Sequence, residues 1–355
     1  MFLTEDIACL NGEYFFAAKE INAICSFNEK DGQIQVLRTD GSGDIWSYRR
    51  YGRIFKYDDK LYFLPLWAHN LLIYHIDTKT FETIPLKKID GYDNDHFFAG
   101  IIIQEKLVMV GCQYPAIAVL DFKTHDLSYY EEPFKELLPK HKKGGDCFFR
   151  CDITNNGTKV YMASCLSNQI LEFDVVDGSY EWHNIGGEKN TYSGIAYDGQ
   201  KFWISPRRGK KAACWDRNNN TIKEFDLPIT YESDDDKGNC TCLGAVYDGK
   251  NIIFPGMEIN KTMIIDPLSV DFEQSMKVLD KGYAFYGHRE GFNYALNKYG
   301  ELEVYSPDDS YKPLKMIKTT NDKTLIASFI HETGEIIHEG YKELELVDFI
   351  NMVTV

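Results

Sequence analysis

The chain has 355 residues, a formal net charge of −15, and hydrophobic side chains at 44% of its positions. This composition predicts a soluble globular protein. It disfavours nucleic acids and anionic membrane surfaces as partners, because lysine and arginine supply most phosphate binding. No run of about 18 apolar residues suggests a membrane span, and the N-terminal residues lack the pattern of a secretion signal. Nine cysteines cannot all pair with one another, so we expect reduced thiols and a cytoplasmic location.

One repeated pattern runs along the chain: an apolar strand, a tight polar turn, a second strand, a variable loop, and a third and fourth strand. Copies of it begin at Ile7, Arg53, Gly100, Cys151, Gly194, Gly244 and Tyr286. Their third strands close at Asn28, Asp77, Asp121, Asp174, Asp216, Asp266 and Ser306. Each of these side chains is able to bond a backbone amide two residues on, which favours a turn. Their average spacing of about 46 residues matches a propeller blade of roughly 40–50 residues.

The repeat therefore predicts an all-β fold, a seven-bladed β-propeller in which each blade is a four-stranded antiparallel sheet. Residues 1–355 then form a single domain, with the repeats over about 7–317. We expect residues 318–355 to close the ring as a β-hairpin followed by a short helix. The alternative is a propeller of eight blades, with this segment forming part of the eighth.

Two copies of the repeat carry a resemblance to known propellers. Tyr197-Asp198-Gly199 and Tyr247-Asp248-Gly249 occupy the first turn of their repeats, and Trp203 and Phe254 follow in the second strand. This order resembles the NHL-like and virginiamycin B lyase-like propellers over nearly the whole ring. The resemblance implies the architecture. The lyases also share His and Glu residues on neighbouring blades, and Glu258 and His288 are the loose candidates for those roles here.

Arginine is concentrated where the repeat predicts long loops and the starts of the innermost strands. Long loops on a rigid ring are where binding residues usually lie, so we expect the site at the loop-rich mouth of the channel. The candidate ligand-binding residues are Arg50, Arg53, Arg150, Arg207, Arg208, Trp67, His69, His96 and Tyr192. Aligning the repeats places Arg53 and Arg150 at the same position, from which they would clamp one anion. The alternative is that these arginines pair with acidic residues such as Asp152 and only bridge blades.

The cysteines do not predict a metal site. Neither Cys240-x-Cys242 nor Cys147-x₃-Cys151 has the paired spacing of a structural zinc site. Buried thiols packed in the inner strands explain these residues better. We therefore expect no metal and no cofactor.

Two functions from different classes fit these features, and the sequence leaves open whether the protein is an enzyme. The first is a binding module whose mouth holds an anionic small molecule, glycan or peptide, or docks a partner protein. The second is a lyase or hydrolase acting on an anionic glycan or cyclic peptide, with Glu258 and His288 as the acid/base candidates.

Overall fold

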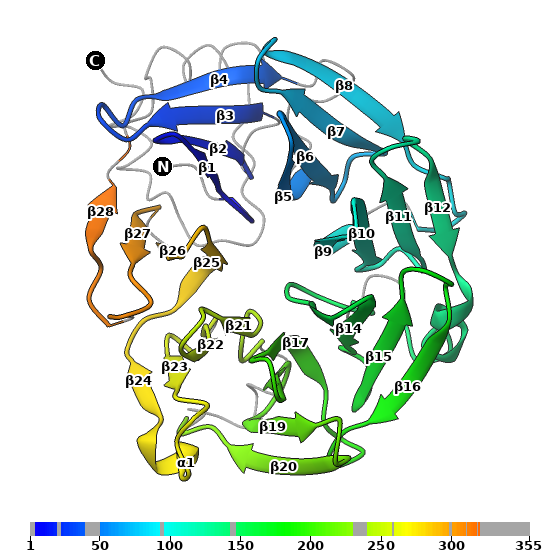
Figure 1. The fold of residues 1–355 in the computed structure, drawn as a ribbon, viewed down its shortest axis with the longest axis vertical. Coiled ribbons are helices and arrows are strands. Elements are labelled where there is room, and N and C mark those ends of the chain that lie inside the picture. Colours follow the sequence, from blue (N-terminus) through cyan, green and yellow to red (C-terminus); the bar gives the residue numbers. More distant parts are fainter. Residues whose placement is uncertain are drawn as a thin grey trace.

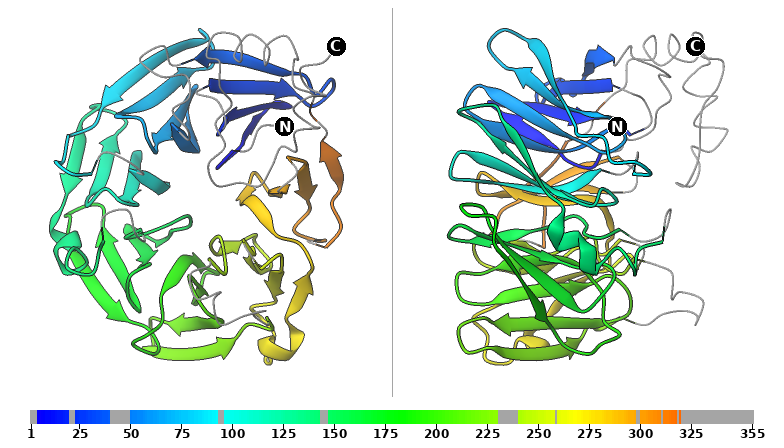
Figure 2. Two further views of the ribbon diagram at one scale, coloured as in Figure 1. Left: turned by 180° about the vertical axis from the view of Figure 1, so that it is seen from behind. Right: turned by 90° about the vertical axis from the view of Figure 1, so that its right-hand side faces the viewer.

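The chain forms seven four-stranded antiparallel sheets arranged as the blades of one ring (Figures 1 and 2). A computed structural model describes residues 4–19, 23–39, 50–92, 96–142, 147–229, 240–257, 259–297, 300–309, 311–317 and 319. Each blade is built from four strands that are consecutive in the sequence. The all-β class and the seven blades are as predicted, and the eight-bladed alternative is wrong.

The first four blades run clockwise from the N-terminus in Figure 1. Blade one consists of β1 (Ala8–Leu10), β2 (Glu13–Ala17), β3 (Ala23–Asn28) and β4 (Ile34–Thr39). Blade two consists of β5 (Tyr51–Tyr57), β6 (Lys60–Pro65), β7 (Asn70–His75) and β8 (Thr80–Pro85). Blade three consists of β9 (Phe97–Ile103), β10 (Lys106–Gly111), β11 (Ile117–Asp121) and β12 (Leu127–Tyr130). Blade four consists of β13 (Thr154–Asn156), β14 (Lys159–Ala163), β15 (Gln169–Asp174) and β16 (Tyr180–Asn184).

The last three blades complete the ring, and helix is confined to two short segments of the described chain. Blade five consists of β17 (Tyr192–Tyr197), β18 (Phe202–Pro206), β19 (Lys211–Asp216) and β20 (Thr221–Asp226). Blade six consists of β21 (Val246–Tyr247), β22 (Ile252–Phe254), β23 (Thr262–Ile265) and β24 (Lys277–Leu279). Blade seven consists of β25 (Tyr283–Arg289), β26 (Phe292–Asn297), β27 (Leu302–Tyr305) and β28 (Lys315–Ile317). The helical segments are η1 (Glu132–Glu136), a 3₁₀ helix, and α1 (Phe272–Ser275).

Polar side chains at the ends of the third strands fix the turns that follow, as the sequence predicts. Asp121 Oδ1 accepts a hydrogen bond of 2.9 Å from the amide of Lys123, two residues on. The same bond to the amide two residues on recurs at Asn28, Asp174, Asp216, Asp266 and Ser306. These local bonds satisfy backbone donors at each turn and so explain why the residue type recurs at the blade period.

The ring closes between blades one and seven by side-chain packing, since each of these blades supplies all four of its own strands. Tyr14 and Tyr294 meet edge to face with ring centroids 6.3 Å apart, inside one apolar cluster drawn from both blades. At the outer edge, Lys315 Nζ lies 2.6 Å from Glu29 Oε1. The predicted closing segment, residues 318–355, lies outside the described residues apart from residue 319.

None of the nine cysteines forms a disulfide, and seven of them are buried. Phe97 and Phe148 are fully buried between blades, where they pack in separate apolar clusters. Within the described residues, no helix has both the length and the apolar character needed to cross a membrane.

Candidate functional site

The register of the innermost strands shows which residues of different blades are equivalent. Asp6, Arg53 and Asp152 each lie four residues before the end of the inner strand of their blade. Arg150 therefore lies two residues further toward the loop side than Arg53. The alignment that paired Arg53 with Arg150 is wrong, because it is shifted by two residues in blade four, where β13 ends at Asn156.

Arg53 reaches across the channel to an acidic residue. Its Nη2 donates a hydrogen bond of 3.0 Å to Asp152 Oδ1, joining blade two to blade four. The guanidinium carbon also lies 5.5 Å from the ring centroid of Phe285 on blade seven. For Arg53, the interpretation as an ion pair that bridges blades is therefore the one that the structure shows.

Asp6 anchors a second pair in the same layer of the channel. It is completely buried and accepts hydrogen bonds from the amides of Ile7 (2.8 Å) and Ile54 (2.9 Å). Arg289 of blade seven donates to Asp6 Oδ2, the oxygen that also accepts from Ile54. We call Asp6, Arg53, Asp152 and Arg289 the charged layer, which links blades one, two, four and seven around the axis.

Asp152 is held tightly by the backbones of blades five and six. A Cβ atom added to Gly244 would lie 1.8 Å from Asp152 Oδ2, so only glycine leaves room for the carboxylate there. Burial raises the pKa of Asp152 to about 6, against the opposing effect of Arg53, while Asp6 raises it further. The carboxyl group therefore titrates close to neutrality.

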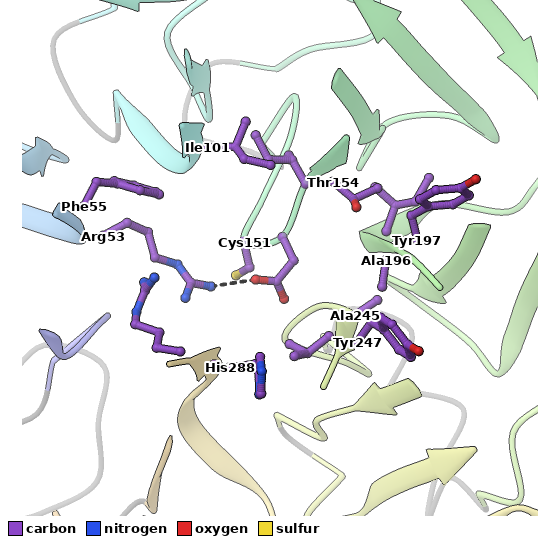
Figure 3. Close-up of a pocket in the computed structure, with 17 residues that line it drawn as sticks. Arg53, Phe55, Ile101, Cys151, Thr154, Ala196, Tyr197, Ala245, Tyr247 and His288 are labelled. Atoms are coloured by element: carbon purple, nitrogen blue, oxygen red, sulfur yellow. Dashed lines mark hydrogen bonds and ion pairs between the residues drawn. The ribbon is translucent and has the colours of Figure 1, made fainter. Parts of the chain in front are cut away.

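A cavity of about 320 Å³ extends from the charged layer toward the short turns (Figure 3). We call it the turn-side cavity. Its lining residues are Arg53, Phe55, Gly100, Ile101, Cys151, Asp152, Ile153, Thr154, Ile195, Ala196, Tyr197, Ala245, Val246, Tyr247, Gly287, His288 and Arg289. All come from first strands or the residues next to them, so five inner strands and the start of β13 contribute to one space.

Aromatic rings form two sides of this cavity. In Figure 3 Phe55 and Arg53 lie on one side, and Tyr197 and Tyr247 lie on the opposite side. The Tyr197 hydroxyl donates to the carbonyl of Gly199 (2.8 Å), and the Tyr247 hydroxyl donates to an equivalent glycine carbonyl at 3.0 Å. These bonds fix both rings against their own turns.

A chain of polar groups orients His288 in the cavity wall. Asn293 Nδ2 donates to Asp248 Oδ2 at 3.0 Å, so the Asn293 Oδ1 atom faces His288 Nδ1 at 2.8 Å. Because an amide oxygen only accepts, Nδ1 carries the proton and Nε2 of the neutral ring keeps its lone pair. His288 is thus set to accept a proton or a hydrogen bond through Nε2.

Arg150 lies at the opposite, loop-side end of the channel. Its Nη2 is 3.8 Å from Met257 Sδ, and its guanidinium carbon is 5.5 Å from the Phe98 ring centroid. Among the residues that the structure describes, no carboxylate pairs with Arg150, and its buried Nε atom has no hydrogen-bond partner. Arg207 is nearby, and the positive charges of the two arginines repel each other.

Cysteines surround these two arginines. Cys147 and Cys240 are electrostatic neighbours of both Arg150 and Arg207. Burial raises the pKa of Cys165, which remains a neutral thiol at physiological pH. We call Arg150, Arg207 and the thiols around them the loop-side mouth.

The other predicted ligand-binding residues lie in different surroundings. His96 is buried and donates from Nδ1 to the Leu66 carbonyl at 2.7 Å, with the ring of His69 5.5 Å away. Trp67 is half-buried against a small apolar cluster. Arg50 is partly buried, and its carbonyl accepts hydrogen bonds from the amides of Leu66 and Ala68 on either side of Trp67.

Of the remaining predicted site residues, one lies in the core, one lies on the surface and one is outside the described residues. Tyr192 is completely buried and donates to the Ile185 carbonyl at 2.7 Å, which is a packing position. Arg208 is exposed. Glu258 lies outside the described residues, so its proposed acid/base role stays a prediction.

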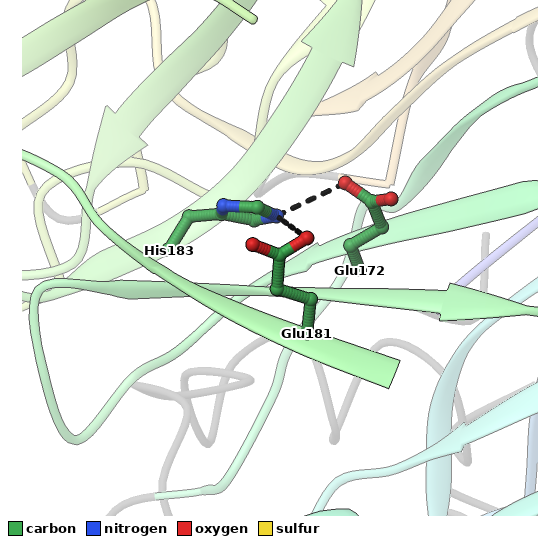
Figure 4. Close-up of side chains that lie close together, drawn as sticks. All are labelled: Glu172, Glu181 and His183. Carbon is green, nitrogen blue, oxygen red and sulfur yellow. Dashed lines mark hydrogen bonds and ion pairs between the residues drawn. The ribbon is translucent and has the colours of Figure 1, made fainter. Parts of the chain in front are cut away.

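A cluster of possible metal ligands on blade four is already occupied by cations of the protein (Figure 4). Glu172 Oε2 lies 3.0 Å from His183 Nε2 and 3.2 Å from Arg217 Nε, and Lys159 binds its other oxygen. Glu181 completes the group at 3.8 Å from the histidine. An arginine at this distance repels a metal ion, so we interpret the cluster as an ion-pair network on the outer strands.

Sequence reasoning missed the charged layer and the turn-side cavity. A signal was present, because Asp6-Ile7 and Asp152-Ile153 are the same dipeptide at the same place in two repeats. It was obscured because the equivalent residue of blade two is Arg53, which has the opposite charge.

Comparison with solved structures supports the architecture. Virginiamycin B lyase from Staphylococcus aureus is similar at a TM-score of 0.63 and 12% identity, covering 86% of this chain and 97% of that one. A streptogramin B lyase has a TM-score of 0.58 and 13% identity, covering 86% and 92%. A chain of the mitotic checkpoint complex has a TM-score of 0.58 and 11% identity, covering 85% and 89%. The protein is thus a seven-bladed β-propeller with the architecture of the virginiamycin B lyases. No protein-family model and no curated protein sequence matches the chain.

Proposed function

We propose that the protein is a binding propeller that holds an anionic group of a small molecule, glycan or peptide at its loop-side mouth. The observation that carries the proposal is the environment of Arg150: a partly buried guanidinium beside a second arginine and several thiols, with no carboxylate partner in the described chain. A partly buried guanidinium without a counter-charge is unfavourable, and a second positive charge nearby makes it more so. A bound carboxylate, phosphate or sulfate supplies that charge, and arginine binds such groups through two parallel hydrogen bonds.

The charged layer narrows the choice of residues in this proposal. Arg53 and Arg289 already have carboxylate partners, whereas no carboxylate of the described residues pairs with Arg150, which lies on the loop side of that layer. The anion is therefore assigned to Arg150, and this site replaces the clamp between Arg53 and Arg150.

The test is calorimetric titration of the full chain with phosphate, sulfate, citrate, glucuronate and a tri-glutamate peptide. Arg150→Met keeps an unbranched side chain against Phe98 and Met257 but removes the charge. Lys223→Met, on an outer strand where Lys223 packs on Phe272 4.2 Å away, is the matched control for lost charge. A charge-assisted bond contributes about 1.5–3 kcal/mol, so an anion should bind Arg150→Met at least about tenfold more weakly than the control. Equal binding by both variants would refute the proposal.

A second candidate is a lyase or hydrolase, and the orientation of His288 favours it. Its Nε2 is available as a base in the wall of the turn-side cavity, the position required of a general base once a substrate is bound. One of the solved propellers is a virginiamycin B lyase with bound quinupristin. Incubation of this protein with quinupristin, followed by chromatography and mass spectrometry, distinguishes the cases. A hydrolysed product is heavier than quinupristin by the mass of one water, whereas a product of elimination has the same mass and a different retention time. The reaction must be absent in His288→Ala for this candidate to stand.

A further inference from the structure

The turn-side cavity is separated from the loop-side mouth by the charged layer. The Arg53–Asp152 pair crosses the channel between them, with side chains only 10% and 17% exposed. Apart from Cys151, which directly precedes Asp152, the residues that line the cavity lie at this layer or on its turn side, whereas Arg150 lies on its loop side. We therefore expect the turn-side cavity and the loop-side mouth to bind separate ligands.

The charges of the cavity are balanced within the protein. Arg53 is paired with Asp152, and Arg289 is paired with Asp6. A further full charge placed here would have to compete with these pairs, which favours an uncharged ligand. In this respect the cavity differs from the loop-side mouth.

These pairs nevertheless leave donors and acceptors for a ligand. An arginine has five N–H donors, and Arg53 uses one in its pair, while the Asp152 carboxylate has about four lone-pair sites. The Thr154 hydroxyl and His288 Nε2 line the same space. Adjacent donors and acceptors match neighbouring hydroxyl groups, since each hydroxyl is able to donate to a carboxylate and accept from a guanidinium.

The rest of the cavity is apolar and partly aromatic. Phe55 faces Tyr197 and Tyr247 across it, and the two tyrosine hydroxyls are occupied by their own turns. The tyrosines therefore offer their rings, on which the C–H face of a sugar packs. A volume of about 320 Å³ lies at the small end of ligand pockets, with room for one ring.

The geometry points to the turn-side cavity as a second ligand site, one that takes an uncharged sugar ring or cyclic polyol. Its hydroxyl groups bond to Asp152, Arg53 and His288, and its apolar face contacts Tyr247. This site is independent of the anion at the loop-side mouth.

The test is saturation-transfer NMR followed by calorimetry with D-glucose, D-galactose, D-mannose, N-acetyl-D-glucosamine and myo-inositol. At least one should bind the wild-type chain, and Tyr247→Ala should weaken that binding about tenfold or more. Tyr57→Ala is the matched control, because Tyr57 also ends an inner strand but stacks on Phe122 and does not line the cavity. Thr154→Phe, which fills the cavity from its wall, should also abolish binding. It tests the same site if Tyr247→Ala is unstable.

The outcomes separate this inference from the proposed function. Arg150→Met should retain sugar binding while losing anions, and Tyr247→Ala should do the reverse. Failure of all five compounds to bind would overturn the inference. So would binding that survives both Tyr247→Ala and Thr154→Phe, or that is lost only in Arg150→Met.

Discussion

Arg53 of blade two donates a 3.0 Å hydrogen bond to Asp152 of blade four, although blade three lies between them in the ring. The pair spans the channel because both residues occupy the same position of their repeats and project into the same layer. The same repeat position thus carries an acidic residue in blades one and four and a basic residue in blade two. The channel is divided by these residues into a turn-side cavity and a loop-side mouth with different electrostatics.

The carboxyl group of Asp152 should give stability a characteristic dependence on pH. Burial raises its pKa from 3.8 to about 6, so the folded chain binds this proton more tightly than the unfolded chain does. The raised pKa stabilises the folded chain fully below about pH 4. This stabilisation, roughly 3 kcal/mol in the free energy of unfolding, is lost as the pH rises through about 6. Asp152→Asn removes this dependence. Between pH 4 and 7.5, the free energy of unfolding of the variant should therefore rise relative to wild type.

Urea denaturation of both proteins at several pH values measures this difference and cancels the contributions of other titrating groups. A constant difference between wild type and Asp152→Asn across this range would show that the carboxyl group titrates normally.

Gly244 should be intolerant of a larger residue. The Cβ of alanine would lie 1.8 Å from Asp152 Oδ2, so the carboxylate or the backbone has to move. Overpacking of this kind costs about 1–3 kcal/mol, and Gly244→Ala should lower the free energy of unfolding by that amount. Gly187→Ala is the control, because its added Cβ would meet its nearest neighbour at 3.8 Å. Equal stability of the two variants would contradict the close contact at Asp152.

Closure of the ring should depend on the packing between blades one and seven. Tyr294 is buried against Tyr14 at this junction, whereas Tyr180 is 38% exposed on blade four. Loss of a buried aromatic ring costs about 3–5 kcal/mol, so Tyr294→Ala should lower stability by that order. Tyr180→Ala should change it by less than about 0.5 kcal/mol. Thermal unfolding compares the two, and a Tyr294→Ala variant as stable as Tyr180→Ala would mean that the junction contributes little.

The fold was predictable from the sequence because its determinants are local. Turn residues such as Asp121 and Asp174 bond to amides two residues away, so their spacing alone reveals the blade period. The pairing of Arg53 with Asp152 joins residues far apart in the chain, and no local pattern encodes it. A shift of two residues in the alignment of blade four was enough to replace Asp152 with Arg150.

The candidate site was predictable in part for the same reason. The concentration of arginine near the loops indicated the loop-side mouth, but it did not show which arginines have carboxylate partners. The sequence predicts Tyr192 as an aromatic ligand-binding residue in a loop, whereas its hydroxyl bonds to the Ile185 carbonyl in the core. Burial of this kind depends on how neighbouring blades pack, which periodicity does not reveal.

The most direct test of the central claim compares thermal unfolding of wild type and Arg150→Met in chloride and in sulfate at equal ionic strength. If an anion binds beside Arg150, sulfate should raise the melting temperature of wild type above its value in chloride, and should do so much less for the variant. In chloride the variant should be at least as stable as wild type, because removal of Arg150 relieves its repulsion with Arg207. The proposed anion site would be contradicted if the variant melts well below wild type in chloride and sulfate raises its melting temperature as much as that of wild type. Arg150 would then be a structural residue.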